Sequence, residues 1–131
     1  MGKYLQVSKK IEELIIDNPK TAGSLSWLNV NSAGKPELEY LLKRQHFTIT
    51  HLKASMAKSL AERAFIEKET NYIFIILHFP IIKDGLVLPA EVEFFMGHGY
   101  LVTIHNGDLP PLMDSFNICK KDENSLLAYE L

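Results

Sequence analysis

The chain of 131 residues has one cysteine, Cys119, and no apolar run that could cross a membrane. A single cysteine forms neither an internal disulfide nor a cysteine-based zinc site. Nothing near it in sequence would lower the pKa of its thiol, so we expect a small, half-buried side chain and not a nucleophile. The most apolar stretch, residues 73–82, contains a histidine and a proline and is about half as long as a spanning helix. With no signal-peptide core at the N-terminus, the sequence predicts a soluble protein in a reducing compartment.

An excess of charge of either sign is also missing. Fourteen Lys and Arg against sixteen Asp and Glu leave a net charge of −2. This balance gives no electrostatic footprint for nucleic acid or for an anionic membrane surface, so we expect neither as a direct partner. The composition is 47% hydrophobic and 23% charged, which predicts one packed domain spanning residues 1–131.

Short runs of β-branched and aromatic residues, bounded by turn residues, are typical of strands. They occur at residues 3–7, 27–30, 63–67, 72–79, 91–96 and 100–105. Residues 11–16 fit either a short strand or one face of a helix. Asp84-Gly85 predicts a turn after the 72–79 strand, and Gly97-His98-Gly99 predicts a hairpin turn between the last two strands. The middle of the chain is therefore expected to be mostly β.

A helix is expected from about Pro36, because proline fits the first helical turn and acidic residues accompany it there. Its buried stripe is Leu38, Leu41 and Leu42. We expect Trp27 to lie in the core beside this stripe, since tryptophan more often packs a core than binds a ligand.

Two further helices are expected. Thr50 is the expected N-cap of a helix that runs to about Leu60, and Asp108 is the expected cap of a helix over residues 110–116. Residues 125–131 have an apolar spacing that stops in mid-pattern, which indicates the N-terminal part of a longer protein. The order of the elements predicts an α/β (α+β) domain with a mixed β-sheet.

Histidines are the first candidates for chemistry. The chain has five, at His46, His51, His78, His98 and His105. No two of them have the spacing of a zinc-binding H-E-x-x-H motif, and none belongs to a Cys/His pattern. His78 and His105 lie in expected strands and would offer a metal or acid–base pair if they met across a sheet, which leaves a small metallohydrolase as a third interpretation. The simpler interpretation is that backbone or water satisfies their nitrogens.

Glycines and acidic pairs define no clearer site. Gly97-x-Gly99 resembles half of a phosphate-binding loop, but it joins two expected strands and no helix follows it. The pairs Glu12-Glu13 and Glu91-x-Glu93 are candidate metal ligands, although a solvated face is the ordinary explanation for them. From the residues alone we expect no catalytic centre and no bound cofactor, and the metal-binding residues stay unknown.

A series of short motifs follows in unbroken order over about residues 25–131. The motifs are Trp27-Leu-Asn-Val, Pro36-Glu-Leu-Glu-Tyr-Leu, Arg63-x-x-Ile66-Glu67, Asn71-Tyr-Ile-Phe-Ile-Ile-Leu, Glu91-Val-Glu-Phe-Phe-Met-Gly, Tyr100-Leu-Val-Thr-Ile-His and Ser125-Leu-Leu-Ala-Tyr-Glu-Leu. In this order and spacing they resemble the N-terminal part of the CorA-type divalent-cation transporters.

This resemblance implies an α/β/α sandwich at the cytoplasmic side of the cell (inner) membrane. Family members are homopentameric channels for Mg²⁺, Co²⁺ or Ni²⁺, and in some branches Zn²⁺. In these channels a long stalk helix and two spanning helices follow the cytoplasmic domain, and the family's pore-mouth Gly-Met-Asn motif is not among these residues. We therefore expect a regulatory and assembly domain of a magnesium or other divalent metal ion transporter. It would not be an enzyme, and alone it would be monomeric or weakly dimeric. The alternative is a stand-alone soluble binding domain of the same fold.

One position departs from the family pattern. Before the Arg63 motif, many members carry a Glu-Asp pair whose Asp contributes to a regulatory cation site between subunits, and the matching positions here are Ser55 and Met56. A hydroxyl and a thioether are poor replacements for a carboxylate around Mg²⁺. We expect weak Mg²⁺ binding at this locus, unless Glu62 or Glu67 has taken over the role. The ordinary interpretation of both glutamates is solvent-facing charge.

Overall fold

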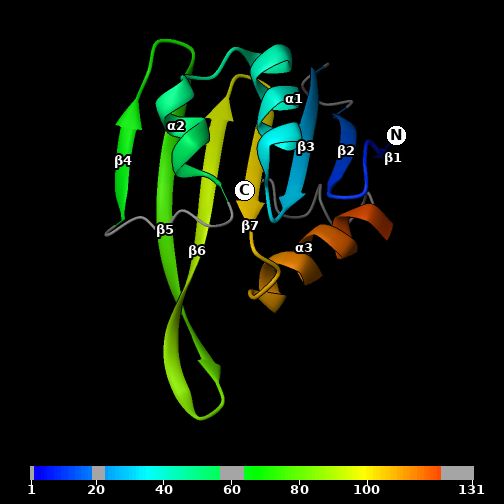
Figure 1. Cartoon of the computed structure of the whole chain (residues 1–131). Helices are drawn as coiled ribbons and strands as arrows, with labels where there is room; N and C mark the ends of the chain where they lie inside the picture. The colour runs from blue at the N-terminus through cyan, green and yellow to red at the C-terminus, as the bar shows by residue number, and fades with distance from the viewer. Residues whose placement is uncertain (1, 19–22, 57–63, 122–131) are drawn as a thin grey trace.

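The computed structural model describes residues 2–18, 23–56 and 64–121 and contains a seven-stranded mixed sheet with helices packed on both faces (Figure 1). The strands are β1 (Gly2–Gln6), β2 (Ile11–Asn18), β3 (Gly23–Asn31), β4 (Phe65–Lys68), β5 (Tyr72–Lys83), β6 (Leu86–Gly97) and β7 (Tyr100–His105). The helices are α1 (Lys35–Gln45), α2 (Ile49–Ala54) and α3 (Pro110–Lys121). This arrangement confirms the expected α/β class with a sheet sandwiched by helices.

Two antiparallel units joined by one parallel pair make up the sheet. The strand order is β1-β2-β3-β7-β6-β5-β4. Strands β1 to β3 form one antiparallel meander, and β4 to β7 form another. The parallel pair is β3 with β7, in which Trp27 lies opposite Leu101, 74 residues later in the chain. This pair makes the two meanders one continuous sheet.

Helices α1 and α2 cover one face of the sheet. The side chains of Leu41 from α1 and Leu52 from α2 belong to the same core cluster as Phe74 of β5 and Phe95 of β6. Phe47, between the two helices, stacks on Phe95 with ring centroids 4.3 Å apart. The expected leucine stripe of the first helix is confirmed as part of this core, because Leu38 and Leu41 are buried and Leu42 packs against the cluster.

Helix α3 covers the opposite face, and Trp27 lies there. Only 8% of Trp27 is exposed, so its expected place in the core is confirmed. Its neighbours are different from those expected: the indole packs edge-on against Phe116 of α3, with ring centroids 4.9 Å apart. Successive strand residues point to opposite faces, so Leu28 occupies the α1 side and Trp27 the α3 side. The expected contact of Trp27 with the α1 leucines is therefore wrong.

The ends of several elements differ from those expected. Residues 11–16 belong to strand β2, which pairs along its length with β3. Helix α2 begins two residues earlier than expected: Thr48 is its extended N-cap, and Thr50 already lies inside the helix. The helix ends at Ala54, because Ser55 forms its C-cap, whereas residues 57–63 lie outside the described ranges. The 125–131 segment also lies outside them.

Helix α3 is longer than the expected 110–116 segment and continues to Lys121. Its extra turn has a packing reason, since Cys119 follows Phe116 by three residues and both are buried against β2 and β3.

Strands β5 and β6 form a much longer hairpin than residues 72–79 and 91–96 predict. Pairing continues to Lys83 opposite Leu86, so that Asp84-Gly85 is a two-residue turn. Both turn residues have positive φ, 52° and 77°, as in the type I′ turn that matches the twist of a hairpin. The distal half of this hairpin projects from the body of the domain (Figure 1). It exposes the apolar side chains of Ile82, Leu86 and Val87.

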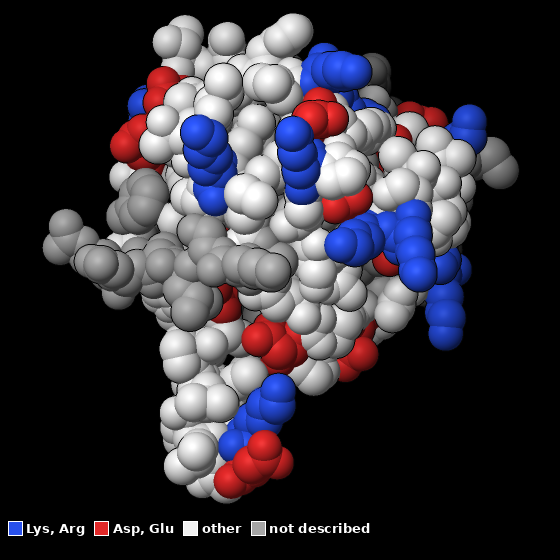
Figure 2. Space-filling model, viewed as in Figure 1, with Lys and Arg blue, Asp and Glu red and all other residues white. Residues whose placement is uncertain are grey.

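Charges of both signs are mixed on the face of the molecule seen in Figure 2. In the described ranges the longest helices have 11 and 12 residues, in α1 and α3. None of the helices there is long and apolar enough to cross a membrane.

Candidate functional site

The Ser55-Met56 position lies at the C-terminal end of α2. Ser55 is buried, and its hydroxyl donates a hydrogen bond of 3.0 Å to the backbone carbonyl of His51, one turn earlier. Met56 follows it and is exposed. The hydroxyl is thus engaged by the helix end and the thioether is a soft donor, so neither side chain suits a hard cation such as Mg²⁺.

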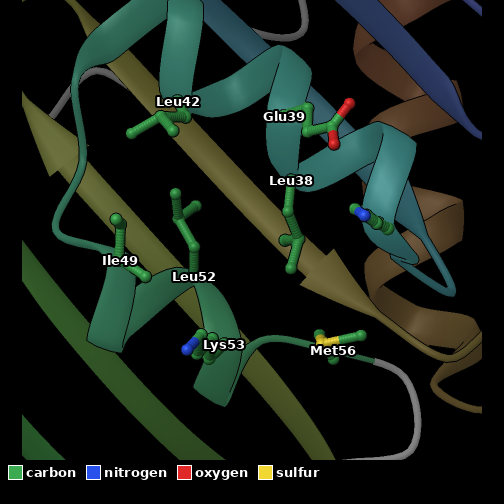
Figure 3. Close-up of a pocket in the computed structure, with 8 residues that line it drawn as sticks. Leu38, Glu39, Leu42, Ile49, Leu52, Lys53 and Met56 are labelled. Carbon is green, nitrogen blue, oxygen red and sulfur yellow. The ribbon is translucent and has the colours of Figure 1, made fainter.

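A groove of about 450 Å³ begins at Met56 and runs between α1 and α2. It is lined by Lys35, Leu38, Glu39, Leu42, Ile49, Leu52, Lys53 and Met56. Figure 3 shows Leu38 and Leu52 extending into the space between the two helices, with Met56 at one end. Because Glu39 is the one carboxylate in this lining, the groove offers an apolar surface and no ligand set for a metal ion.

The acidic pairs are not the solvated faces that the sequence pattern indicates. Glu13 is buried on the α1 side, where its carboxylate pairs with the guanidinium of Arg44. Arg44 Nη1 lies 3.2 Å from Glu13 Oε1, and the hydroxyl of Ser26 donates a further hydrogen bond of 2.8 Å. Glu12 points to the other face and accepts a hydrogen bond of 2.6 Å from the hydroxyl of Tyr4. Glu13 and Arg44 fasten the end of α1 to β2, which is a structural role.

Glu91 and Glu93 are both buried, and they lie two residues apart on the face of β6 that carries α1 and α2. Burial raises the pKa of Glu93 to about 10, and the hydrogen bond and negative charge of Glu91 act in the same direction. Glu93 therefore holds a proton at neutral pH and shares it with its neighbour. His78 Nε2 lies 3.1 Å from Glu91 Oε1. The raised pKa of Glu93 predicts that the stability of the fold falls as pH rises.

The structure does not bring His78 and His105 together. His78 is opposite Glu91 on the α1 side of the sheet. His105 follows Ile104, whose side chain belongs to the α1-side core, so His105 points to the α3 side. The expectation that the two histidines could form a pair across the sheet is wrong, because β6 separates their strands and they face opposite ways.

His105 is buried and lines a small polar pocket of about 110 Å³ together with Glu12, Asn29 and Asn31. The backbone N–H of Gly107 donates to its Nδ1 at 3.0 Å, so the neutral ring carries its proton on Nε2. Burial lowers the pKa of His105, which keeps the ring neutral. Its Nε2 is a buried atom without a hydrogen-bond partner among the described residues. In this tautomer Nε2 carries the proton and Nδ1 already accepts a hydrogen bond, so the ring offers no free lone pair to a metal ion.

The remaining candidates have structural explanations. Cys119 is more buried than expected, and burial raises the pKa of its thiol, which disfavours the reactive thiolate. Gly97-His98-Gly99 forms the expected hairpin turn between β6 and β7, with Gly99 at φ 80°. His46 is the left-handed C-cap residue of α1.

A cluster that the sequence pattern does not single out lies at the β4 edge of the sheet. His51 Nε2 of α2 is 2.7 Å from Glu67 Oε1 of β4 and 4.0 Å from Glu69 Oε1. Glu67 is half exposed, which agrees with the expectation of a solvent-facing charge. It also contacts the buried His51. Glu62 lies outside the described ranges. Sixteen and eighteen residues separate His51 from the glutamates, so only the folded arrangement shows that they meet.

Solved structures with a similar fold include three that bear on the family of this chain. The soluble domain of CorA from Methanocaldococcus jannaschii is 16% identical, with a TM-score of 0.63, over 75% of this chain and 38% of that chain. The complete CorA magnesium transporter from the same organism is 14% identical, with a TM-score of 0.66, over 92% and 39%. The full-length CmaX protein is 10% identical, with a TM-score of 0.57, over 84% and 30%. The chain therefore spans well under half the length of each.

The seven-stranded sheet with helices on both faces thus defines a domain of the CorA soluble-domain type. The model of the CorA-like Mg²⁺ transporter protein family matches residues 22–130. The chain belongs to the CorA-like Mg²⁺ transporter family, as its series of motifs indicates. No curated protein matches it.

Proposed function

We propose that the chain is the N-terminal cytoplasmic domain of a CorA-like divalent-cation transporter, in which residues 1–131 act in regulation and assembly. The observation that carries this proposal is the family match over residues 22–130 on a fold like that of a CorA soluble domain. The transported or sensed ion would be Mg²⁺ or another divalent cation. The full-length protein would be a homopentamer at the inner membrane, and the 131 residues alone would be monomeric or weakly dimeric.

A regulatory role without catalysis agrees with the chemistry of the described side chains. Cys119 has a raised thiol pKa, His105 is held neutral by burial, and His78 pairs with Glu91. None of these three side chains belongs to a chain of nucleophile, base and orienting group, which covalent catalysis requires. The family match also supports a transporter part over a stand-alone binding domain, because family members are transporters.

The experiment that tests this proposal begins with the gene beyond Leu131. A long charged helix followed by two apolar segments of ~20 residues is expected there. The full-length gene should restore growth at low Mg²⁺ to cells without Mg²⁺ uptake of their own, whereas residues 1–131 expressed alone should not. A stop codon soon after Leu131, or a full-length protein that binds no membrane, would instead support the stand-alone domain.

A further inference from the structure

We propose that His51, Glu67 and Glu69 form a binding site for a borderline divalent cation of the Zn²⁺ type. The residues come from α2, from β4 and from the turn after β4, and one ligand atom of each lies within 4.8 Å of the other two. The inference stands on these contacts and does not rest on the transporter assignment. It also concerns a different place from the Ser55-Met56 position.

The imidazole of His51 is held with Nε2 directed at the two carboxylates. Only 3% of its side chain is exposed, and its ring stacks on that of Phe74, with centroids 4.3 Å apart and planes 18° from parallel. The second ring nitrogen of His51, Nδ1, lies 2.8 Å from the hydroxyl oxygen of Tyr72. That oxygen also accepts a hydrogen bond of 2.9 Å from the backbone N–H of Thr48. The ring is therefore fixed before any ion arrives.

Tyr72 also permits the ring tautomer that a metal needs. A phenolic oxygen has two acceptor sites, so it can accept the N–H of Thr48 and a second N–H from His51 Nδ1. With the ring proton on Nδ1, the lone pair of Nε2 can bind a cation, which would replace the hydrogen bond between Nε2 and Glu67. Metal-binding histidines usually hold their second nitrogen in a hydrogen bond of this kind.

The ligand set fits zinc in number, charge and spacing. Around a tetrahedral Zn²⁺, with bonds of about 2.0–2.2 Å, ligand atoms lie roughly 3.4 Å apart. The distances of 2.7 Å and 4.0 Å from His51 Nε2 to the glutamates lie on either side of this value. Glu67 and Glu69 are 54% and 37% exposed, so both side chains can adjust without repacking the core. Two carboxylates balance the charge of the ion, and a water can take the fourth position.

The imidazole selects the kind of ion. Nitrogen ligands favour Zn²⁺, Co²⁺ and Ni²⁺, whereas Mg²⁺ prefers an all-oxygen shell and retains its water. We therefore expect Zn²⁺ to bind more tightly than Co²⁺, and Mg²⁺ not to compete at equal concentration.

The competing explanation is a plain ion pair that fastens α2 to the edge strand. That role needs only His51 and Glu67, which are in hydrogen-bond contact. Glu69, at 4.0 Å, makes no hydrogen bond to the ring, so in a plain ion pair it would add only a weak attraction to a protonated His51. Glu69 is consequently the residue that separates the two explanations.

The test is calorimetric titration of the 131-residue chain with ZnCl₂, with CoCl₂ absorption spectra as a second measurement and MgCl₂ as the comparison ion. Wild type should bind one Zn²⁺ and give the visible absorption of a four-coordinate Co²⁺ site. Glu69→Gln should weaken Zn²⁺ binding at least about tenfold, because it removes a charged ligand. Its metal-free melting temperature should equal that of wild type. The matched control is Glu39→Gln on α1, which removes an exposed carboxylate and should leave Zn²⁺ affinity unchanged.

Tyr72→Phe gives an independent check, since it keeps the ring and removes the hydroxyl beside Nδ1. A loss of about 10–100-fold in Zn²⁺ affinity is expected. The inference is overturned if wild type shows no saturable Zn²⁺ binding. It is equally overturned if Zn²⁺ binds with the same affinity to Glu67→Gln and Glu69→Gln, since the ion would then lie elsewhere on the chain.

Discussion

Glutamine in place of Glu93 should remove a dependence of stability on pH that the native protein carries. Glu93 is buried beside Glu91, and its pKa in the folded state is raised to about 10, whereas an unfolded chain has a glutamate pKa near 4.3. Between these values the folded state binds a proton that the unfolded state has released. Stability is therefore fully present below the unfolded pKa and is lost as pH rises.

The expected size of this effect follows from one proton. A full proton difference changes the free energy of unfolding by about 1.4 kcal/mol per pH unit. From pH 5 to pH 8 the wild type should lose up to about 4 kcal/mol through this group, a large part of the 5–15 kcal/mol that is ordinary for a domain. Glu93→Gln keeps the size and hydrogen-bonding capacity of the protonated acid but cannot ionise. The variant should match wild type near pH 5 and be the more stable protein at pH 8.

The assay is urea unfolding at half-unit steps from pH 5 to pH 8, followed by circular dichroism. Histidines change charge in this range, and His78 lies 3.1 Å from Glu91, so the same comparison is made in a His78→Gln background. Glu39→Gln, at an exposed site, controls for the loss of one carboxylate. If the difference between Glu93→Gln and wild type is constant across this range, Glu93 is ionised in the folded protein and the reasoning fails.

Three other predictions concern packing, an ion pair and magnesium. Trp27→Ala should cost on the order of 3–5 kcal/mol in guanidinium unfolding, because the indole fills the space against Phe116 and donates a 3.0 Å hydrogen bond to Thr103; an unchanged midpoint would place it on the surface. Arg44→Met should cost about 3 kcal/mol because it leaves the Glu13 carboxylate buried without its counter-charge, and adding Glu13→Gln should recover most of that loss in the same urea assay. Millimolar Mg²⁺ should not raise the melting temperature above a control of matched ionic strength, since Ser55-Met56 lacks a carboxylate; a clear rise that Met56→Asp does not increase would contradict this.

Much of the fold is predictable because hydrophobic periodicity and turn chemistry act locally. The leucine stripe of α1 and the glycine turn before β7 both follow from residues close together in the chain. The position of Trp27 shows what local patterns do not predict. Its burial follows from its size, but its face depends on the register of β3 against β7, which is set by residues 74 positions away.

The candidate site depends even more on long-range contacts. The sequence pattern names Glu67 as a possible replacement ligand but does not connect it with His51, and the two meet only because α2 packs beside the edge strand β4. The prediction for Glu93 fails for another reason. Its charge predicts a solvent-exposed position, but the strands and helices around β6 bury it. Charged residues in the interior violate a local rule, so hydrophobicity patterns cannot place them.

The parallel contact of β3 with β7 also has a consequence for the order of folding. The hairpins within each meander can form in microseconds, because their partners are neighbours in the chain. The β3–β7 contact must instead close a loop of 74 residues, which costs roughly 4 kcal/mol of chain entropy before the two halves stabilise each other. We expect amides of the β5–β6 hairpin to gain protection early in pulsed hydrogen exchange, and those between β3 and β7 to gain it last. The rate at which this domain refolds would then be set by the formation of the parallel β3–β7 pair in the middle of its sheet.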